Sequence, residues 1–231
     1  MKTIGMIGGM SWESSCVYYQ LINREVQARL GGIHSARALL HSFDFDEIAR
    51  LQDAGRWDDA TARMNEAGQG LARSGADFLI ICCNTMHRMA GAVEKAAGRP
   101  LLHIADPLGS AIRKSGVSRI GLIGSRHTME QDDIVIGRLR RAYDLDVLVP
   151  QGAEFAAIDR IVYGELVRGK FLEPSRALCR AAIAGLVARG CEAVVLGCTE
   201  FPLLVKQEDS PVPLFDTTTL HALAAVEMAL G

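Results

Sequence analysis

The feature that most constrains the fold is an internal repeat. Residues 71–83 match residues 186–198 at an offset of 115, and the matched pairs include Leu71 with Leu186, Gly75 with Gly190 and Cys83 with Cys198. Residues 4–8 match residues 120–124 at nearly the same offset, 116. Buried parallel strands resemble each other because all are rich in Val, Ile and Leu. Glycines and cysteines that agree at one offset are harder to obtain by chance, so the repeat predicts a duplicated α/β unit.

Short apolar runs alternate with longer amphipathic runs along the chain, which is typical of βαβα folds with mostly parallel sheets. Strands are expected at residues 3–8, 36–43, 77–83, 101–105, 119–124, 146–150, 193–197 and 212–215. Helices are expected at residues 13–30, 57–72, 128–142, 158–168 and 174–188. Gly31 and Gly32 suit the end of the first helix, and Pro174 suits the first turn of the last.

These elements predict an α/β protein of two duplicated Rossmann-like αβα lobes. Their mostly parallel sheets would be related by pseudo-two-fold symmetry, with the active site in the interlobe cleft. The first lobe is expected at residues 1–105, with a C-terminal return formed by residues 208–231, and the second at residues 106–207. Two crossings between the lobes favour a defined cleft over a flexible tether.

The charge balance excludes several classes of partner. Lys and Arg number 25 against 27 Asp and Glu, so the basic surface that nucleic-acid binding requires is not expected. The longest apolar run, residues 78–83, is far shorter than the roughly 20 residues that cross a bilayer. The N-terminal residues have neither the apolar region nor the cleavage site of a signal peptide. We therefore expect a cytoplasmic protein that binds neither nucleic acid nor membranes.

The chain has six cysteines, at positions 16, 82, 83, 179, 191 and 198. In a cytoplasmic protein of this size, free thiols are expected rather than disulfides. No Cys-x-x-Cys occurs and no histidine has ligand spacing from a cysteine pair, so no metal site is expected. Neighbouring residues of a strand point to opposite faces, so only one of Cys82 and Cys83 can face a cleft. We expect core positions for Cys16, Cys82, Cys179 and Cys191.

Cys83 and Cys198 each follow an expected buried strand and precede a polar, turn-like segment. In open α/β sheets, ligands bind beyond the carboxyl ends of the strands. A helix that begins after each cysteine would direct backbone N–H groups at the same place, which binds a carboxylate and favours thiolate over thiol. Two thiols on opposite faces of one carbon can remove an α-proton and return another, which inverts a stereocentre without a cofactor.

The segments around these cysteines resemble the paired motifs of the aspartate/glutamate racemase family. The paired motifs are ICCNTMH (residues 81–87) and LGCTE (residues 196–200). Segments IGGMSWES (residues 7–14), IGS with TME (residues 123–130) and FDTT (residues 215–218) are similar to its amino-acid-racemase branch. The resemblance covers nearly the whole chain. It implies an isomerase that interconverts the L and D enantiomers of aspartate, or of both aspartate and glutamate, with two cysteines and no pyridoxal phosphate or other cofactor.

Position by position, the resemblance makes Cys83 and Cys198 the acid/base pair, with Cys198 on the L-substrate face. It implies substrate contacts from six residues: Met10, Gln52, Asn84, Thr85, Thr199 and Glu200. It also implies a small anionic amino acid as substrate, and a homodimer.

The residues that select the substrate side chain are not given by the resemblance. Some relatives hold the side-chain carboxylate with an arginine in a Pro-rich loop near residue 50, where this chain reads SFDFDEI (residues 42–48). Arg50, Arg168 and Lys170 are alternative cations, although a solvated surface role is expected for each. A one-methylene difference is worth only about 1–3 kcal/mol, so the sequence does not choose between aspartate and glutamate.

Several other functions are compatible with single features of the sequence. Residues 5–9 suggest a phosphate loop, but neither Gly-x-Gly-x-x-Gly nor a P-loop lysine is present. Residues 9–13 lack the final glycine of a nucleophile elbow. His87, one helical turn after Cys83, could serve as the base of a thiol hydrolase, although a local hydrogen bond is the commoner role. The remaining alternatives are a related carboxylate isomerase or decarboxylase, and a bilobal amino-acid-binding protein with structural thiols.

Overall fold

The computed structural model describes residues 1–132 and 134–231, which form two compact units. The first comprises Met1–Ile104 and His221–Gly231, and the second comprises Ala105–Leu220. The expectation that the C-terminal return begins at residue 208 is wrong for residues 208–220. Strand β8 (Leu214–Asp216) pairs with β7 (Ala193–Gly197) and therefore completes the second sheet.

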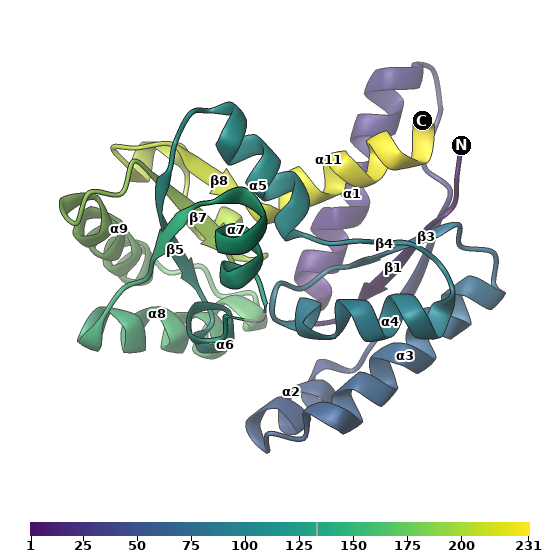
Figure 1. Cartoon of the computed structure of the whole chain (residues 1–231), viewed down its shortest axis with the longest axis horizontal. Helices are drawn as coiled ribbons and strands as arrows, with labels where there is room; N and C mark the ends of the chain where they lie inside the picture. Colours follow the sequence, from purple (N-terminus) through teal and green to yellow (C-terminus); the bar gives the residue numbers. More distant parts are fainter. Residues whose placement is uncertain (133) are drawn as a thin grey trace. The chain divides into compact units, whose positions relative to one another are not determined.

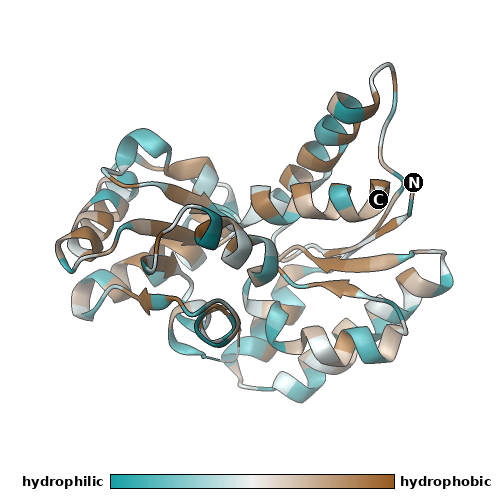
Figure 2. Cartoon of the chain, turned by 45° about the horizontal axis from the view of Figure 1, so that its top comes forward, coloured by the Kyte–Doolittle hydropathy of each residue, from teal (hydrophilic) through white to brown (hydrophobic). Residues whose placement is uncertain are grey.

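The first unit contains a parallel sheet of strand order β2-β1-β3-β4. Its strands are β1 (Ile4–Gly8), β2 (Ala38–Ser42), β3 (Phe78–Ile81) and β4 (Leu101–Leu102). Strands β1 and β3 are buried along their whole length, as the apolar runs predicted. Figure 2 shows the hydrophobic colouring of these strands against the mixed colouring of the helices.

Helices cover both faces of the first sheet, as Figure 1 shows. One face packs against α1 (Trp12–Leu30) and the C-terminal part of α11 (Thr217–Leu230), and the other against α3 (Trp57–Arg73) and α4 (Ala90–Ala97). Helix α2 (Phe45–Asp53) precedes α3, and the 3₁₀ helix η1 (Thr85–Met89) leads into α4. Parallel strands that are covered on both sides need apolar residues at every position, which explains the unbroken runs in the sequence.

The second unit repeats this topology with the parallel order β6-β5-β7-β8. Its other strands are β5 (Arg119–Gly124) and β6 (Asp146–Leu148). Its helices are α5 (Ala105–Lys114), α6 (Arg126–Glu130), α7 (Ile136–Tyr143), α8 (Gly152–Gly164), η2 (Leu166–Arg168), α9 (Glu173–Ala188), α10 (Phe201–Leu204) and η3 (Gln207–Asp209). A Cβ on Gly121 would lie 2.7 Å from Leu186 Cδ1, so the glycine lets α9 approach β5 closely. The α/β class with mostly parallel sheets is confirmed.

All the expected strands are present, and their bounds differ by a few residues at the ends. The single helix expected at residues 128–142 is wrong, because α6 ends at Glu130 and α7 begins at Ile136. Helices α2, α4 and α5 were not predicted. Within the described residues, no helix combines the length and hydropathy that crossing a membrane requires.

Gly9, in the β1–α1 turn, adopts a conformation that only glycine accepts readily. Its φ is 83°, and a Cβ there would lie 2.3 Å from the backbone nitrogen of Phe43. The turn is also fixed by a hydrogen bond from the Gly9 N–H to Ser15 Oγ at 2.9 Å.

We expect Gly9→Ala to lower the free energy of unfolding by about 1–2 kcal/mol or more, because left-handed backbone and a steric clash both oppose a Cβ. Urea denaturation measures this loss. Gly55→Ala is the matched control, since its φ is 66° but nothing lies within 4 Å of its Cβ position. An equal loss in the two variants would show that the contact with Phe43 contributes nothing.

Candidate functional site

Cys83 is the thiol that β3 presents beyond its carboxyl end. Cys82 is fully buried in the cluster beneath α1 and α11, whereas Cys83 is half-buried against the cluster on the opposite face. The expectation that these neighbours point to opposite faces is confirmed. Burial, and after it the adjacent Cys83, raises the pKa of Cys82 far above its ordinary value. Cys82 is therefore an inert core residue.

The expected substrate contacts of the first unit lie in one region around Cys83. Met10, in the β1–α1 turn, belongs to the same apolar cluster as Met86. Gln52 of α2 is 5% exposed, and its Nε2 donates to Met86 Sδ at 3.0 Å. Asn84 and Thr85, both buried, follow Cys83 directly at the start of η1. The structure thus brings α2, the β1–α1 turn and the Cys83 segment together.

A cluster of buried histidines supports the Cys83 segment. His87 Nδ1 lies 2.8 Å from the Cys83 carbonyl oxygen, and because a carbonyl only accepts, Nδ1 carries the proton. The expected local hydrogen bond of His87 is confirmed. Its ring centroid lies 4.7 Å from that of His103 and 5.5 Å from that of His221. His221 Nε2 donates to the Leu102 carbonyl at 2.9 Å, so its Nδ1 accepts from the Tyr18 hydroxyl, also at 2.9 Å.

The surroundings of His87 favour its neutral form. Burial, followed by the nearby His103 and His221, holds the pKa of His87 well below its ordinary value. Its buried Nε2 has no hydrogen-bond partner in the described part of the chain, so a second ring proton would be buried without an acceptor. Protonation would therefore disturb the segment that carries Cys83.

Stability is expected to fall as the pH is lowered from about 7 to 5. His87 binds its proton less readily in the folded chain than in the unfolded chain, whose pKa is near 6.5. Below that pH the unfolded chain binds more protons, so the free energy of unfolding decreases by up to about 1.4 kcal/mol per pH unit for this group. Chemical denaturation at several pH values should give a shallower slope for His87→Asn, while His34→Asn, at an exposed position, retains the parental slope. A parental slope in His87→Asn would contradict the assignment.

Cys198 is the corresponding thiol of the second unit, and it contacts a carboxylate. It follows β7, is half-buried, and donates from Sγ to Glu200 Oε2 at 2.9 Å. The Thr199 hydroxyl donates to the same oxygen at 3.0 Å. Glu200 is only 1% exposed, so one buried carboxylate oxygen accepts both hydrogens. Glu200 can therefore hold or receive the thiol proton of Cys198.

The turn between β8 and α11 holds this segment in place. Thr217 Oγ1 donates to the Leu196 carbonyl at 2.9 Å, and Thr218 Oγ1 to the Thr199 carbonyl at 3.4 Å. Asp216 accepts from the Thr218 N–H at 2.8 Å, and burial raises the pKa of this carboxyl. The Asp216–Thr218 part of the sequence motif thus acts on the backbone around Cys198.

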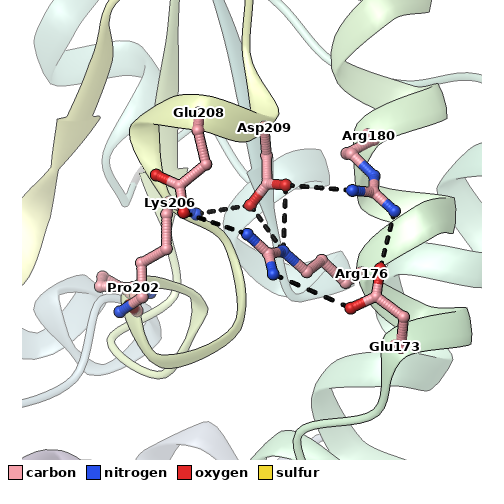
Figure 3. Close-up of polar contacts among 7 residues, drawn as sticks. All are labelled: Glu173, Arg176, Arg180, Pro202, Lys206, Glu208 and Asp209. Atoms are coloured by element: carbon pink, nitrogen blue, oxygen red, sulfur yellow. Dashed lines mark hydrogen bonds and ion pairs between the residues drawn. The ribbon is translucent and has the colours of Figure 1, made fainter.

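An ion-pair cluster anchors the chain that follows Cys198 to helix α9 (Figure 3). Arg176 Nε donates to both carboxylate oxygens of Asp209, at 3.0 and 2.8 Å. Arg180 Nη1 donates to Asp209 Oδ1 at 3.4 Å. Burial opposes ionisation of Asp209. Hydrogen bonds from the Lys206 backbone N–H and from the Arg176 side chain outweigh this effect and lower the pKa of Asp209. The cluster fixes the connection between α10 and β8.

The other cysteines and the candidate cations differ in burial. The core positions expected for Cys179 and Cys191 are confirmed, and burial raises the pKa of Cys179 to about 12. The core position expected for Cys16 is wrong, because α1 buries the face of Tyr18 and turns Cys16 to solvent. Arg50, Arg168 and Lys170 are exposed, as expected.

Neither a cation nor a metal ligand set is buried near the thiols. Across residues 1–132 and 134–231 no lysine or arginine is buried, and no group of three or more His, Cys, Asp or Glu is arranged to hold a metal ion. The helices that follow the two cysteines are short, a 3₁₀ helix in η1 and four residues in α10. The buried donors closest in sequence to the two thiols, Asn84, Thr85 and Thr199, are neutral.

Sequence reasoning missed two parts of this site. The contact between Glu200 and the Cys198 thiol joins residues only two apart, but whether such a side chain folds back depends on the turn geometry. His103 and His221, 16 and 134 residues from His87, carry no local signal. Only the pairing of β4 with β3 and the packing of α11 bring them to His87.

Comparison with known proteins identifies a consistent set of relatives. The family model for Asp/Glu/hydantoin racemases matches residues 7–225. A Yersinia pestis protein assigned as an Asp/Glu racemase is 45% identical, with a TM-score of 0.92 and full coverage of both chains. An aspartate racemase homologue from Pyrococcus horikoshii is 30% identical, with a TM-score of 0.83 and full coverage of both. A glutamate racemase from Pseudomonas aeruginosa is 25% identical over 183 residues, which are 78% of this chain but only 64% of that relative.

Proposed function

Because the chain belongs to the Asp/Glu/hydantoin racemase family, we propose that it is a cofactor-independent amino-acid racemase, an isomerase acting on aspartate or on both aspartate and glutamate. The observation that carries the proposal is the pair of repeat-matched thiols. Cys83 and Cys198 each lie beyond the carboxyl end of a central strand and are half-buried, whereas Cys82, Cys179 and Cys191 are buried.

In the proposed reaction, the two thiols act on opposite faces of the substrate α-carbon. One thiolate takes the α-proton, and the electron pair of the broken C–H bond is delocalised into the substrate carboxylate. The other thiol gives its proton to the opposite face of the carbon and becomes the thiolate. The product is the other enantiomer, and the protonation states of Cys83 and Cys198 are exchanged. Cys198 acts on the L face.

Glu200 is proposed to serve Cys198. Its carboxylate accepts the thiol hydrogen at 2.9 Å, which places a proton acceptor beside the sulfur when Cys198 is a thiol. The buried setting strengthens this contact, because few water molecules compete for the carboxylate oxygen. Glu200 therefore acts through Cys198, and the Thr199 hydroxyl at 3.0 Å keeps the carboxylate in position.

The remaining expected contacts are proposed to bind the substrate. The side chains of Asn84 and Thr85 supply neutral donors beside Cys83, and these stabilise the charge that develops on the substrate carboxylate. Thr199 is proposed to contribute its backbone N–H, because its hydroxyl already donates to Glu200. Met10 and Gln52 line the side-chain end of the site, where Gln52 is already held by Met86. We further propose that the enzyme is cytoplasmic and forms a homodimer.

Incubation with L- or D-aspartate, and separately with L- or D-glutamate, tests the function. Chiral chromatography is expected to show approach to a racemic mixture from either enantiomer, without added cofactor. Tight binding without turnover would identify an amino-acid-binding protein, and loss of carbon dioxide would identify a decarboxylase. Either result would overturn the proposal.

A further inference from the structure

His87 lies near the carboxyl ends of β3 and β4, and the proposed reaction gives it no part. It belongs to η1, which follows Cys83, and it is only 2% exposed. Its ring packs against that of His103, which directly follows β4, and against that of His221 in α11. Burying a polar ring at the ligand-binding edge of a parallel sheet costs free energy unless its hydrogen bonds serve the structure or the site.

The hydrogen bonds of His87 show that it is not a base for the Cys83 thiol. Its Nδ1 carries the proton and lies 2.8 Å from the Cys83 carbonyl oxygen. The other ring nitrogen, Nε2, has no hydrogen-bond partner within residues 1–132 and 134–231, so it does not contact the sulfur of Cys83. A thiol–imidazole pair of the kind that thiol hydrolases use is therefore not formed between these two residues. His87 acts on the backbone instead.

His87 holds the carbonyl groups of both Cys83 and Asn84. Its ring donates to the Cys83 carbonyl, and its backbone N–H donates to the Asn84 carbonyl at 3.1 Å. The peptide bond between Cys83 and Asn84 is trans, so the Asn84 N–H points in the direction opposite to the Cys83 carbonyl. Because the ring fixes the direction of this carbonyl, it also fixes the direction of the N–H, which points away from the histidine rings.

The Cys83 side chain and the histidine rings lie on opposite sides of the first sheet. Cys83 packs against the apolar cluster that includes Met86 and lies under α3 and α4. Tyr18, which hydrogen-bonds His221 at 2.9 Å, belongs to the cluster under α1 and α11. The ring of His87 therefore draws the Cys83 carbonyl toward the α1 side, which turns the adjoining N–H toward the side of the thiol.

We propose that His87 is a positioning residue for Cys83. By holding the Cys83 carbonyl, the ring keeps the thiol and the Asn84 N–H directed at one place, where the thiol meets the substrate α-carbon and the N–H stabilises the substrate carboxylate. The inference rests on the proposed function and adds to it a side chain that touches neither the substrate nor the thiol.

The second unit holds its thiol in a different way. At the repeat offset of 115, Pro202 matches His87, and a proline ring donates no hydrogen bond. Carbonyl groups of the Cys198 segment accept instead from the hydroxyls of Thr217 and Thr218. A change at His87 is therefore expected to affect Cys83 and to leave Cys198 as it is in the parent.

Two amide substitutions test the hydrogen bond to the Cys83 carbonyl. An asparagine side chain places its N–H₂ near the position of the histidine Nδ1, whereas the longer glutamine places it near Nε2. We expect kcat of His87→Gln to fall by about 10- to 100-fold with little change in KM, because a displacement of about 1 Å costs up to about 10²-fold. His87→Asn should recover most of this loss. His34→Gln makes the same change at an exposed histidine and should keep the parental rate.

Exchange of the substrate α-proton in deuterium oxide separates positioning of Cys83 from a general structural role. The Cys198→Ser variant is expected to exchange D-aspartate through Cys83, and the Cys83→Ser variant to exchange L-aspartate through Cys198. Adding His87→Gln should lower the first exchange by about 10- to 100-fold and leave the second unchanged. Equal losses in both backgrounds, or no loss in either, would overturn the proposal.

Alkylation of the thiols distinguishes failure of this inference from failure of the proposed function, because it needs no turnover. Mass spectrometry measures the rate at which iodoacetamide labels each cysteine. His87→Gln should label Cys83 about fivefold faster than the parent, the factor that one net hydrogen bond contributes, and should label Cys198 at the parental rate. A protein that shows this pattern without racemisation would contradict the proposed function alone. An unchanged rate at Cys83 would overturn the role of His87.

Circular dichroism shows whether His87→Gln is folded. If it is not, His87→Asn and nitrogen-15 NMR of the parent take its place. A folded, active His87→Asn variant, together with a ring proton on Nδ1 of His87 in the parent, supports the proposal. A ring proton on Nε2 would overturn it, because Nδ1 would then have no hydrogen to donate to the Cys83 carbonyl.

Discussion

Replacing either Cys83 or Cys198 with serine is expected to lower racemisation of the substrate by about 10²- to 10⁴-fold. Serine keeps the size of the side chain but is a far weaker acid than a thiol, so it neither takes nor returns the α-proton efficiently. Because the two enantiomers have equal free energies, kcat/KM should fall equally in both directions. Initial rates from each pure enantiomer, followed by chiral chromatography, measure the loss.

The matched control is Cys16→Ser, which makes the same substitution at an exposed thiol outside the proposed site. Exchange of the substrate α-proton with solvent, without inversion, further distinguishes the roles of the two cysteines. We expect each single variant to exchange chiefly the enantiomer that faces its remaining thiol. Parental rates in both single variants would eliminate the two-base mechanism.

Glu200→Gln is expected to lower kcat by about 10²-fold, a smaller effect than that of the cysteine variants. The amide has the same shape but is not a proton-accepting carboxylate, so the contact with Cys198 Sγ loses its function. Because Glu200 is proposed to act through Cys198, KM should change little and the pH profile of kcat should change. If the role of Glu200 were only structural, Glu200→Gln would lower stability and leave the pH profile of kcat unchanged from the parent.

Glu200→Asp supplies the comparison for this prediction. It keeps the carboxylate but withdraws it from the sulfur by one methylene, so an intermediate rate is expected. A rate for Glu200→Asp no higher than that of Glu200→Gln would show that the carboxylate itself contributes nothing. Circular dichroism and urea denaturation of both variants separate this outcome from a loss of folding.

The central strands were predictable because buried strands appear in the sequence as unbroken apolar runs. Strands β1, β3, β5 and β7 lie inside their sheets and are covered on both faces, which demands apolar runs. The repeat also anticipated the common strand order of the two sheets. The C-terminal return was placed too early, because nothing local shows that residues 214–216 pair with β7 before the chain returns to the first unit.

The candidate site was predictable only in part, because some of its contacts depend on turns and packing and not on the local sequence. The ends of β3 and β7 identify Cys83 and Cys198, since ligand sites in parallel sheets lie beyond the strand ends. Exposure of Cys16 was not predicted, because free cysteines are usually buried, whereas α1 buries the side that carries Tyr18 and Ile22 and leaves Cys16 exposed. Contacts that depend on a turn or on packing, such as Glu200 with Cys198, require coordinates.

The most direct test of the central claim is racemisation of unlabelled L-aspartate by the unaltered protein in deuterium oxide, followed by proton NMR and chiral chromatography at early times. If Cys83 and Cys198 act on opposite faces, the D-aspartate formed carries deuterium at the α-carbon while the remaining L-aspartate keeps its α-hydrogen. The converse holds when D-aspartate is the starting material. Substrate that loses its α-hydrogen as fast as product forms would show that a single base serves both faces and would contradict the account.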